Sequence, residues 1–401
     1  MAGDARGERI RVLIVVNTLG VGGAEVQLAR TVPEIDSDTF DVQVAFYSKV
    51  AEGHPGEMLA GAGVKVAFLD RDRWGRLRYF AKAAAFMRRE DFDIVHAWTG
   101  TANLYGRVPA ILAGMPCILG GLRGRRTADG RNGVVYSITN WRCSGWTVNA
   151  RDIKEIATRR LRFIRRSPIF VVPNGIDLGD EGRFMRTRKV YYDTLTSGRP
   201  VIGTVSRLAP VKNHKLFVEM ARHLTEAGFH ADYWIIGDGP MQGQVRAAVD
   251  RYGLADRVRL LGYRRDVDAA LARMDVFVLT SDSEGCPNAL LEAMRASLPV
   301  VSTHCTSLED IVEEGVNGYT VPRGDARGLA DRVTQIMADP DAKRAMGTES
   351  RRIIEQRFAM PVAVRRLQDV YIDCLRRVAD RRPGVRAKLR RLGLDRPQAA
   401  K

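Results

Sequence analysis

The sequence contains few cysteines and no long apolar run, and these two absences exclude whole classes of protein. Only 5 of its 401 residues are cysteine, an odd number, and no two of them form a C-x-x-C pair. This pattern argues against a zinc site or a disulfide framework and for a reducing compartment. No segment approaches the ~20 consecutive apolar residues that a membrane-spanning helix needs. The first residues, MAGDARGERI, lack the layout of a signal peptide, so we expect a cytoplasmic location.

The remaining composition is that of an ordinary globular protein. Hydrophobic residues make up 45% of the sequence and charged residues 27%, and both values are normal for a soluble fold. A chain of 401 residues is long enough for two or three domains, each with a core of its own.

Positive charge is concentrated in three segments. Their formal net charges are +3 for residues 121–131, +5 for residues 151–166 and +8 for residues 376–401, which together equal the net charge of +16 of the whole chain. Such segments attract a phosphorylated substrate, an anionic membrane or nucleic acid. The plain alternative is that they are solvated faces of a protein from a basic proteome.

Short apolar runs alternate with helical patterns along the whole chain. Residues 10–16 form a continuous apolar run, which is typical of a strand buried on both faces, and residues 101–113 are expected to form one helix. Further strands are expected at residues 41–46, 64–69, 93–97, 201–205, 232–236, 257–262 and 275–279. This alternation predicts doubly wound parallel sheets, which bind ligands at the carboxyl ends of their strands.

The stretch from Thr280 to Val301 has the clearest features of a ligand site. It follows a predicted strand, and Pro287 stands where a helix is expected to begin, a position at which the missing N–H costs nothing. The amides of the next residues favour an anion; they belong to Asn288, Ala289 and Leu290. Glu284 and Glu292 supply carboxylates for hydroxyl groups. A sugar nucleotide, which has an anionic centre and hydroxyl-bearing parts, fits this arrangement.

Two cations and a histidine are expected at the ends of other strands. Arg207 and Lys212 follow the strand at residues 201–205, where they can neutralise a diphosphate leaving group. The alternative, two solvated cations at a helix start, is disfavoured because cations there oppose the helix dipole. His96 falls at the carboxyl end of its strand and is either a ligand contact or a packed histidine that caps a loop.

Several motifs, in the same order along the chain, resemble those of the family 4 retaining glycosyltransferases of GT-B fold. The strongest is EGCPNALLEAM, which contains Glu284 and Glu292; GGAE after the first strand, DIVHAW, IFVVPNGID, and SRL followed by Lys212 match further motifs. The sequence departs from the pattern at Ser206, where a glycine is usual, and at residues 303–308, where two glycines are common. The resemblance covers residues 10–377.

The resemblance implies two Rossmann-like domains that face each other across a cleft, and a role for each matched residue. Glu284 and His96 would contact the donor sugar, and Glu292 would hold the ribose of the nucleotide. The remaining donor-site candidates are Arg207 and Lys212 at the diphosphate, Gly22 and Gly23 beside it, Arg264 near the base, and the amides of Asn288, Ala289 and Leu290.

Acceptor recognition in this family usually lies in variable loops of the first domain. Residues 120–149 mix glycine, arginine and aromatic residues, and tryptophan and arginine can stack on sugars and clamp phosphates. The acceptor candidates are therefore Arg123, Arg125, Arg126 and Trp141. The alternative is that this segment is an irregular surface loop.

The same resemblance predicts the division of the chain. Residues 1–178 would form the acceptor domain, residues 179–199 a linker and residues 200–360 the nucleotide-sugar domain. A helix at residues 361–377 would cross back to the first domain, and residues 378–401 would form a basic tail.

We expect a hexosyltransferase-type enzyme that moves a sugar, with retention, from a nucleotide sugar to a lipid-linked or polysaccharide acceptor in cell-envelope or exopolysaccharide synthesis. A UDP-sugar is favoured over a GDP-sugar as donor. No metal or other cofactor is expected, because arginine and lysine can supply the charge that Mg²⁺ supplies elsewhere. The alternatives are a GT-B-like nucleotide-sugar epimerase, a pyridoxal-dependent phosphorylase and a non-enzymatic basic protein that binds a surface or nucleic acid.

The basic segments also predict attachment to the inner face of the plasma membrane. Cations near an anionic leaflet contribute about 1 kcal/mol each, and residues 386–394 (RAKLRRLGL) have a short amphipathic pattern. We therefore expect a peripheral membrane protein, with no nucleic acid as partner.

Overall fold

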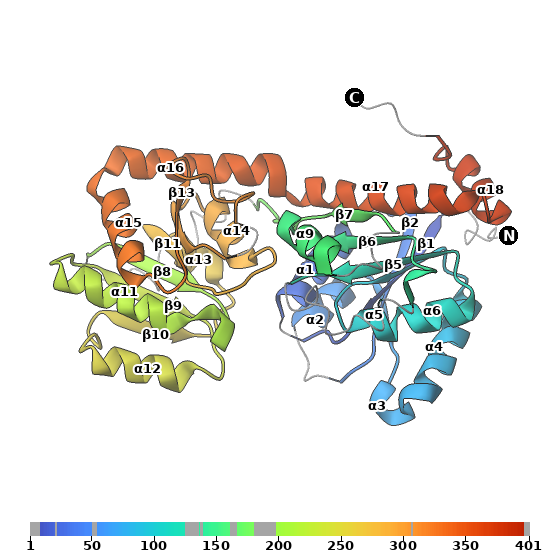
Figure 1. The fold of residues 1–401 in the computed structure, drawn as a ribbon, viewed down its shortest axis with the longest axis horizontal. Coiled ribbons are helices and arrows are strands. Elements are labelled where there is room, and N and C mark those ends of the chain that lie inside the picture. The colour runs from blue at the N-terminus through green and yellow to red at the C-terminus, as the bar shows by residue number, and fades with distance from the viewer. Residues whose placement is uncertain are drawn as a thin grey trace. The chain divides into compact units, whose positions relative to one another are not determined.

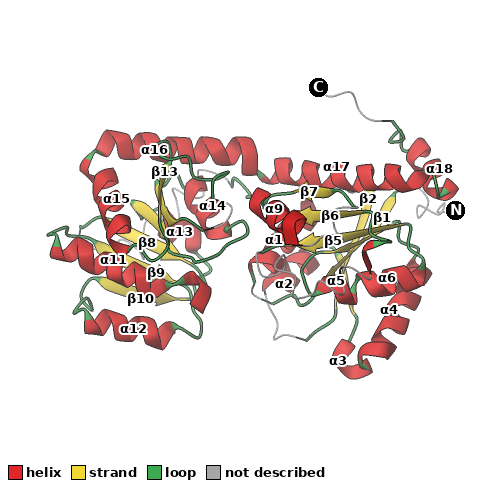
Figure 2. Ribbon diagram, viewed as in Figure 1, coloured by secondary structure: helices red, strands yellow, loops and turns green. Residues whose placement is uncertain are grey.

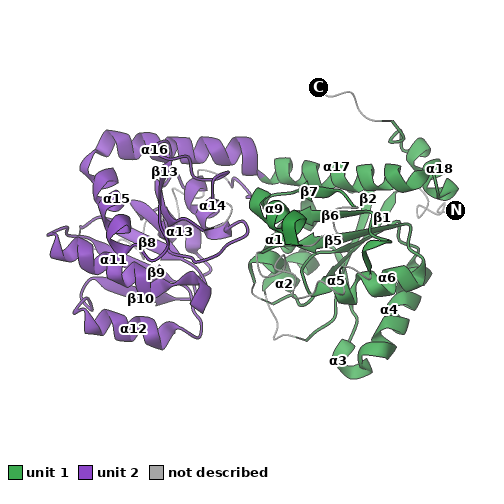
Figure 3. Ribbon diagram, viewed as in Figure 1, with its two compact units in different colours: residues 1–175, 360–401 green, residues 176–359 purple. Residues whose placement is uncertain are grey.

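The computed structural model describes residues 9–20, 22–49, 54–124, 136, 139–160, 167–179, 198–305 and 308–396. The chain forms two compact units (Figure 3): unit 1 comprises residues 1–175 and 360–401, and unit 2 comprises residues 176–359. Unit 1 is therefore completed by the C-terminal part of the chain. Among the described residues, no helix is long and apolar enough to cross a membrane.

Unit 1 is built on a seven-stranded parallel sheet with the order β3-β2-β1-β4-β5-β6-β7 (Figure 1). Its strands are β1 (Ile10–Val16), β2 (Phe40–Phe46), β3 (Lys65–Phe68), β4 (Ile94–Ala97), β5 (Cys117–Leu122), β6 (Gly145–Val148) and β7 (Ile169–Val171). Every residue of β1 is buried. One hydrophobic cluster lies on each face of this strand, which is why its apolar run is continuous rather than alternating.

Helices of unit 1 cover both faces of the sheet (Figure 2). They are α1 (Gly23–Thr31), the short η2 (Val32–Glu34), α2 (His54–Gly61), α3 (Arg71–Trp74), α4 (Arg76–Glu90), α5 (Ala102–Tyr105), α6 (Arg107–Ala113), α9 (Arg151–Arg160), α17 (Met360–Ala379) and α18 (Pro383–Arg391). In α17 the buried side chains recur every three or four residues, as in Leu367, Tyr371 and Cys374. This spacing places one face of the helix in the core of unit 1.

Unit 2 repeats the architecture with six parallel strands in the order β10-β9-β8-β11-β12-β13. The strands are β8 (Val201–Val205), β9 (Asp232–Ile236), β10 (Val258–Gly262), β11 (Val276–Leu279), β12 (Val300–Thr303) and β13 (Gly318–Val321). The helices are η5 (Pro210–Lys212), α11 (His214–Glu226), α12 (Gln242–Arg251), α13 (Val267–Leu271), α14 (Asn288–Arg295), α15 (Ala326–Ala338), α16 (Pro340–Ile353) and the π-helical η6 (Ile354–Phe358).

Both sheets change the direction of their strand order at the first strand, between β1 and β4 in unit 1 and between β8 and β11 in unit 2. The predicted doubly wound architecture is therefore confirmed. In such sheets the crevice at the carboxyl ends of these two strands is the expected ligand position. The loops that follow β1, β4, β8 and β11 are consequently the places to look for a site.

The helix expected at residues 101–113 is instead two helices, α5 and α6, that meet at Gly106. A side chain at Gly106 would put its Cβ 2.9 Å from the carbonyl oxygen of Ala102 and 3.1 Å from Cβ of Val15. The close approach of the chain to β1 therefore requires a glycine, and the helix breaks there.

The segment predicted as a basic tail, residues 378–401, contains the helix α18. Val385 and Leu389 of this helix are buried in the core of unit 1, and Leu392 and Leu394 pack against the same cluster. The apolar side of the predicted amphipathic segment is thus used for packing inside the protein.

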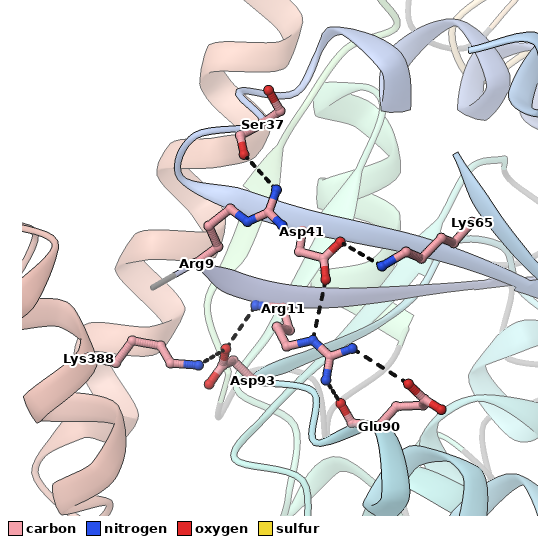
Figure 4. A network of polar contacts seen from close by, with 8 residues as sticks. All are labelled: Arg9, Arg11, Ser37, Asp41, Lys65, Glu90, Asp93 and Lys388. Carbon is pink, nitrogen blue, oxygen red and sulfur yellow. Dashed lines mark hydrogen bonds and ion pairs between the residues drawn. The ribbon is translucent and has the colours of Figure 1, made fainter. Parts of the chain in front are cut away.

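A network of charged side chains ties α18 to the amino ends of the unit 1 strands (Figure 4). Nζ of Lys388 lies 2.7 Å from Oδ2 of Asp93, which also accepts the backbone N–H of Arg11 at 2.8 Å. The guanidinium of Arg11 contacts the carboxylates of Asp41, at 3.4 Å, and Glu90, at 3.6 Å. Arg11 and Lys388 thus have partners of opposite sign, and Arg9 donates to the carbonyl of Ser37 at 3.2 Å.

Candidate active site

In unit 2, the loops after β8 and β11 meet at the point where the strand order reverses. The ammonium of Lys212, at the end of η5, forms an ion pair with Oε1 of Glu284. The hydroxyl of Ser281 donates to the same oxygen at 2.6 Å. The Lys212 and Glu284 side chains are 23% and 10% exposed, so the pair is largely shielded but still accessible. The structure therefore brings together two of the predicted site residues.

Hydrogen bonds between the two loops fix this arrangement. The backbone N–H of Asp282 donates to the carbonyl of Val211 at 2.9 Å, and the hydroxyl of Thr280 donates to the carbonyl of Lys212 at 2.9 Å. The side-chain amide of Asn213 donates to the carboxylate of Asp282 at 3.3 Å. The Lys212 and Glu284 pair is consequently held by the backbone on both sides.

Arg207 lies one residue beyond Ser206 on the loop after β8 and is exposed. Its guanidinium makes no hydrogen bond or ion pair within the part of the chain that the structure describes. A charged side chain in this state is able to reorient toward an anion at the carboxyl edge of the sheet. The structure is therefore compatible with the predicted clamp, in which Arg207 and Lys212 contact one diphosphate.

The loop after β8 is pressed against the turn of the GDGP sequence. Gly237 and Gly239 have φ values of 135° and 153°, and Cβ atoms there would lie 1.9 Å from the carbonyl oxygen of Ser206 and 2.6 Å from that of Leu208. The backbone N–H of Leu208 donates to the carbonyl of Asp238 at 2.9 Å. These glycines are required because two backbone segments approach closely here. The contact fixes the position of the loop that carries Arg207.

Sequence reasoning missed the contact between Ser206 and His214. Oγ of Ser206 lies 2.9 Å from Nε2 of His214, at the start of α11. Burial, together with the smaller effect of the Lys212 charge, lowers the pKa of His214 to about 4, so the ring is neutral near pH 7. The departure from glycine at position 206 was visible in the sequence, but its partner eight residues later was not.

The first turn of α14 differs in part from the prediction. Pro287 precedes the helix in an extended conformation, and its carbonyl accepts the N–H groups of Leu290, at 3.1 Å, and Leu291, at 3.2 Å. The backbone N–H of Leu290 is therefore hydrogen-bonded within the first turn of the helix, and its side chain is buried. The prediction that the Leu290 amide faces a ligand is wrong, which leaves Asn288 and Ala289 as the candidates.

Two predicted donor-site residues lie on other parts of unit 2. Glu292 is on α14, half-buried, one turn beyond Asn288. Arg264 follows the edge strand β10, where its guanidinium makes a two-pronged contact of 3.0 and 2.9 Å with the carboxylate of Asp266. Arg264 is thus held by a local ion pair, two strands away from the strand-order reversal.

In unit 1, the corresponding loops bring an arginine onto a tryptophan. Cζ of Arg123, just after β5, lies 3.4 Å from the centroid of the Trp98 ring, and Nη1 donates to Oδ1 of Asn174 at 3.2 Å. The indole N–H of Trp98 donates to the carbonyl of Ala24 at 2.9 Å. The predicted acceptor residue Arg123 therefore lies at the carboxyl edge of the sheet, beside the first turn of α1.

The predicted glycines Gly22 and Gly23 lie at that same first turn, where Gly22 is the N-cap of α1 and Gly23 is exposed. Glu25 follows them. Burial raises the pKa of this carboxyl, while its own backbone N–H and the charge of Arg123 act in the opposite direction. The edge of unit 1 thus combines exposed backbone, a half-buried carboxyl and a stacked guanidinium.

His96 does not take the predicted position at the ligand surface. It is 0% exposed; Nδ1 lies 3.0 Å from the hydroxyl of Tyr371 on α17, and Nε2 lies 2.9 Å from the hydroxyl of Thr147 on β6. Burial lowers its pKa to about 3. Both ring nitrogens are used inside the protein, so the packed-histidine interpretation holds and the predicted contact with the sugar is contradicted.

The other acceptor candidates do not join Arg123. Trp141 precedes β6, whereas Arg123 follows β5, so they lie at opposite edges of a parallel sheet. The prediction that they share a site is therefore wrong. Trp141 is 75% exposed, and the guanidinium of Arg142 lies 5.7 Å from its ring centroid. Arg125 and Arg126 lie outside the described residues, as do Thr306 and Ser307, most of the linker and residues 161–166.

Two family models match the chain: Glycosyltransferase Family 4 over residues 21–180 and Glycosyl transferases group 1 over residues 199–339. The UDP-Gal:alpha-D-GlcNAc-diphosphoundecaprenol alpha-1,3-galactosyltransferase of Escherichia coli is 27% identical over 299 residues, 72% of this chain and 77% of that protein. The amylovoran biosynthesis glycosyltransferase AmsK of Erwinia amylovora is 31% identical over 175 residues, but that match spans only 42% of this chain and 43% of the relative.

Among solved structures, Anabaena HepE in complex with UDP-glucose has a TM-score of 0.76 at 19% identity, over 90% of this chain and 99% of that one. This similarity extends over both units and concerns the fold. The two family models together cover most of the chain, and each matches the larger part of one unit. The chain therefore belongs to the family 4 (group 1) glycosyltransferases of GT-B fold, which confirms the predicted family, fold and enzyme class.

Proposed function

We propose that this glycosyltransferase transfers a hexose from a UDP-sugar to a lipid-linked acceptor during synthesis of a cell-envelope polysaccharide, with retention of configuration at the anomeric carbon. The relatives support this choice: the Escherichia coli enzyme is named for UDP-Gal and a diphosphoundecaprenol acceptor, and the Erwinia enzyme for a polysaccharide. The structural relative HepE is solved with UDP-glucose. A uridine nucleotide thus appears in the names of two of these proteins, and a lipid diphosphate acceptor in the name of the Escherichia coli enzyme.

The ion pair of Lys212 and Glu284 carries the proposal. Within the described ranges of the chain, the donors to this carboxylate are the Lys212 ammonium and the Ser281 hydroxyl, and both contact Oε1. Oε2 is thereby left to accept a hydrogen bond from a hydroxyl of the donor sugar. Lys212 lies next to that sugar and on the loop that also bears Arg207. One cation that orients the carboxylate and a second that is exposed give a site for a sugar bonded to a diphosphate.

In the proposed reaction the bond between the anomeric carbon and the distal phosphate oxygen breaks, and negative charge develops on the diphosphate. Arg207 and Lys212 stabilise that charge more strongly in the transition state than in the bound substrate, which is the condition for catalysis. The acceptor hydroxyl attacks the same face of the sugar, and its proton passes to the departing phosphate oxygen. We propose that the two cations do this without a metal ion, and that Glu292 binds the ribose.

In unit 1 we propose that Arg123 and the exposed backbone at Gly23 contact the acceptor diphosphate. Arg123 is held at the carboxyl edge of the sheet by the ring of Trp98, and a planar guanidinium is suited to two-pronged contact with a phosphate. His96 has a packing role in this scheme, because its ring contacts Trp98 at a centroid distance of 5.3 Å and supports it from below. We further propose a cytoplasmic location at the inner face of the plasma membrane, where a lipid-linked acceptor is reached.

The donor assignment is tested by thermal unfolding of the full-length protein with UDP, GDP and ADP. A ligand that binds only the folded state stabilises it by about 2.7 kcal/mol at a concentration of one hundred times its Kd. We expect a selective rise in Tm with UDP in the wild type, the same rise in Lys215→Ala, which removes an exposed cation beside the site, and a smaller rise in Arg207→Ala. Equal shifts with all three nucleotides would contradict the uridine assignment.

The reaction class is tested by following a UDP-hexose with and without a lipid diphosphate acceptor. Transfer predicts a new glycosidic bond only when the acceptor is present. Conversion of the donor into an isomeric UDP-hexose without acceptor would instead identify an epimerase.

A further inference from the structure

The face of α4 that points to solvent is entirely basic or apolar. Residues 71–90 contain seven basic and two acidic residues, and α4 buries Tyr79, Ala83, Ala84 and Met87 against the sheet. Its exposed residues are Arg76, Leu77, Arg78, Ala81, Lys82, Ala85, Arg88 and Arg89. The exposed residues therefore comprise five cations and three apolar residues along a helix of 15 residues, about 22 Å long. The acid of this helix, Glu90, is half-buried at its end and pairs with Arg89.

An apolar side chain projects from the beginning of this face. Leu77 is 83% exposed, more than any other large hydrophobic residue among those that the structure describes. Trp74, one turn earlier, is half-buried and lies under Lys82, whose Nζ is 4.5 Å from the ring centroid. Arg76 and Arg78 flank Leu77 directly. The corner between α3 and α4 thus combines an exposed leucine and a tryptophan with several cations, and its exposed acid, Asp72, is paired with Arg71.

The position of this corner relates it to the proposed acceptor site. The chain enters α3 and α4 from the carboxyl end of β3, and all strands of the sheet are parallel. Leu77 therefore lies toward the same edge of unit 1 as Gly22 and Arg123, which follow β1 and β5. In Figure 1 this corner projects from unit 1, with α3 at its tip.

We propose that the exposed face of α4 is the membrane contact of this protein, with its cations against anionic lipid headgroups and Leu77 inserted among them. A helix with a cationic face attracts an anionic leaflet, and an apolar residue at its end adds insertion. This inference rests on the proposed function, because a membrane contact at α4 would bring the acceptor edge of unit 1 close to a lipid-linked substrate. It replaces α18 as the inserting segment, because the apolar side of α18 is packed in the core.

The charge pattern favours a bilayer over a nucleic acid. Binding to a phosphate backbone requires cations alone, whereas this face begins with an exposed leucine. It also has alanines at its centre, and these small side chains permit a flat approach to a surface. Nucleic-acid binding is therefore the competing outcome of the test, with no separate site proposed for it.

The test is co-sedimentation of the full-length protein with vesicles of phosphatidylglycerol and phosphatidylcholine at low salt. The test variant is Arg76→Gln, Arg78→Gln and Lys82→Gln combined. Each cation near an anionic leaflet contributes about five-fold in binding, so the triple variant is expected to bind about 100-fold more weakly. Leu77→Gln is expected to lose about five-fold. Vesicles of phosphatidylcholine alone are expected to bind little of any variant.

A matched control removes three exposed cations from unit 2, by Lys215→Gln, Arg246→Gln and Arg251→Gln. A loss in this control as large as in the α4 triple variant would overturn the proposal, because it would show attraction by net charge alone. So would unchanged vesicle binding of the α4 triple variant, or binding of the wild type to a single-stranded RNA oligomer but not to vesicles. Circular dichroism and the UDP thermal shift, both expected to be unchanged in the α4 variants, separate a failure of this surface from a failure of the donor site.

Discussion

Each unit contains a lysine that is paired with a carboxylate, and the two pairs differ in what surrounds them. Lys212 and Glu284 in unit 2 are 23% and 10% exposed, and Lys388 and Asp93 in unit 1 are 15% and 12% exposed. The first pair joins two loops at the carboxyl edge of its sheet. The second pair joins a helix to the amino edge of its sheet, inside the charge network of Figure 4. The two pairs are therefore buried to a similar extent but have different roles. The pair in unit 2 faces the proposed ligand site, and the pair in unit 1 is covered by packed side chains.

The edge of the sheet explains the difference. The carboxyl ends of strands at a reversal of strand order form a crevice that no helix fills, so a charge there remains available. At the amino edge of unit 1, Oδ2 of Asp93 accepts hydrogen bonds from the backbone N–H of Arg11 and the ammonium of Lys388, and the residue is buried beneath α18. A lysine and carboxylate pair is therefore informative about function only when its place in the sheet is known.

The largest effect on activity is expected from substitutions that break the Lys212 and Glu284 pair of unit 2. Lys212→Ala should lower kcat by at least about 100-fold, because removing one contact to a developing oxyanion costs 10²–10³. Glu284→Gln should also lower kcat strongly, because it removes the charged partner of Lys212 and the charged acceptor proposed for a sugar hydroxyl. The thermal midpoint of the protein without ligand should hardly change. Transfer assays and thermal unfolding measure the two quantities, and loss of the fold in both variants would show that the pair is structural.

A smaller effect is expected from breaking the packing of His96. The variant His96→Phe leaves the hydroxyls of Tyr371 and Thr147 without their shared partner, which should cost about 2 to 4 kcal/mol of unfolding free energy. Denaturant unfolding measures this loss. The kcat of the folded fraction should remain near that of the wild type, and a loss of 100-fold in kcat would restore the catalytic assignment of His96.

The unit 1 pair should give the reverse pattern of the unit 2 pair. Lys388→Ala leaves Asp93 with one donor fewer and loosens α18, so we expect a loss of about 1 to 2 kcal/mol in unfolding free energy with unchanged kcat. Urea unfolding and the transfer assay measure these. Arg344→Ala, which removes an exposed paired cation of unit 2, is the control and should lose less than about 0.5 kcal/mol.

The buried histidines sharpen the comparison through pH. The folded pKa values of His96 and His214, about 3 and about 4, lie below the ordinary value near 6.5. The unfolded chain therefore binds more protons between pH 4 and 6.5, and stability should fall as pH falls through that window, by at most about 1.4 kcal/mol per pH unit for each histidine. Unfolding of the wild type and of His214→Asn from pH 7 to 4.5 measures this. An equal slope in both proteins would contradict the assignment of His214 as a buried neutral ring.

The sequence predicted the unit 2 site well because its residues lie on loops directly after apolar strands. Lys212 and Glu284 are 72 residues apart, yet each follows its own strand. Because the two strands are adjacent and parallel, their carboxyl ends bring the two side chains together. Leu290 was misassigned because the carbonyl of Pro287 can accept from the third residue of the helix, which the sequence does not reveal.

The sequence predicted unit 1 less well because its contacts come from distant segments. His96 ends a strand, as a ligand residue would, but Tyr371 lies 275 residues later and occupies the imidazole. Trp141 and Arg123 are close in sequence but separated by the length of a strand. The pattern of α18 suits lipid and protein equally, and the basic face of α4 was overlooked because acidic residues elsewhere balance its charge in the sum.

The return of the chain to unit 1 at Met360 has a consequence for biosynthesis. Unit 2 is continuous, whereas the core of unit 1 lacks Leu367, Tyr371 and Cys374 until the ribosome has made α17. Domains usually fold in the order of their synthesis, but here the unit that begins first is finished last. The apolar side chains of unit 1 that pack against α17 therefore lack this partner while the whole of unit 2 emerges from the ribosome.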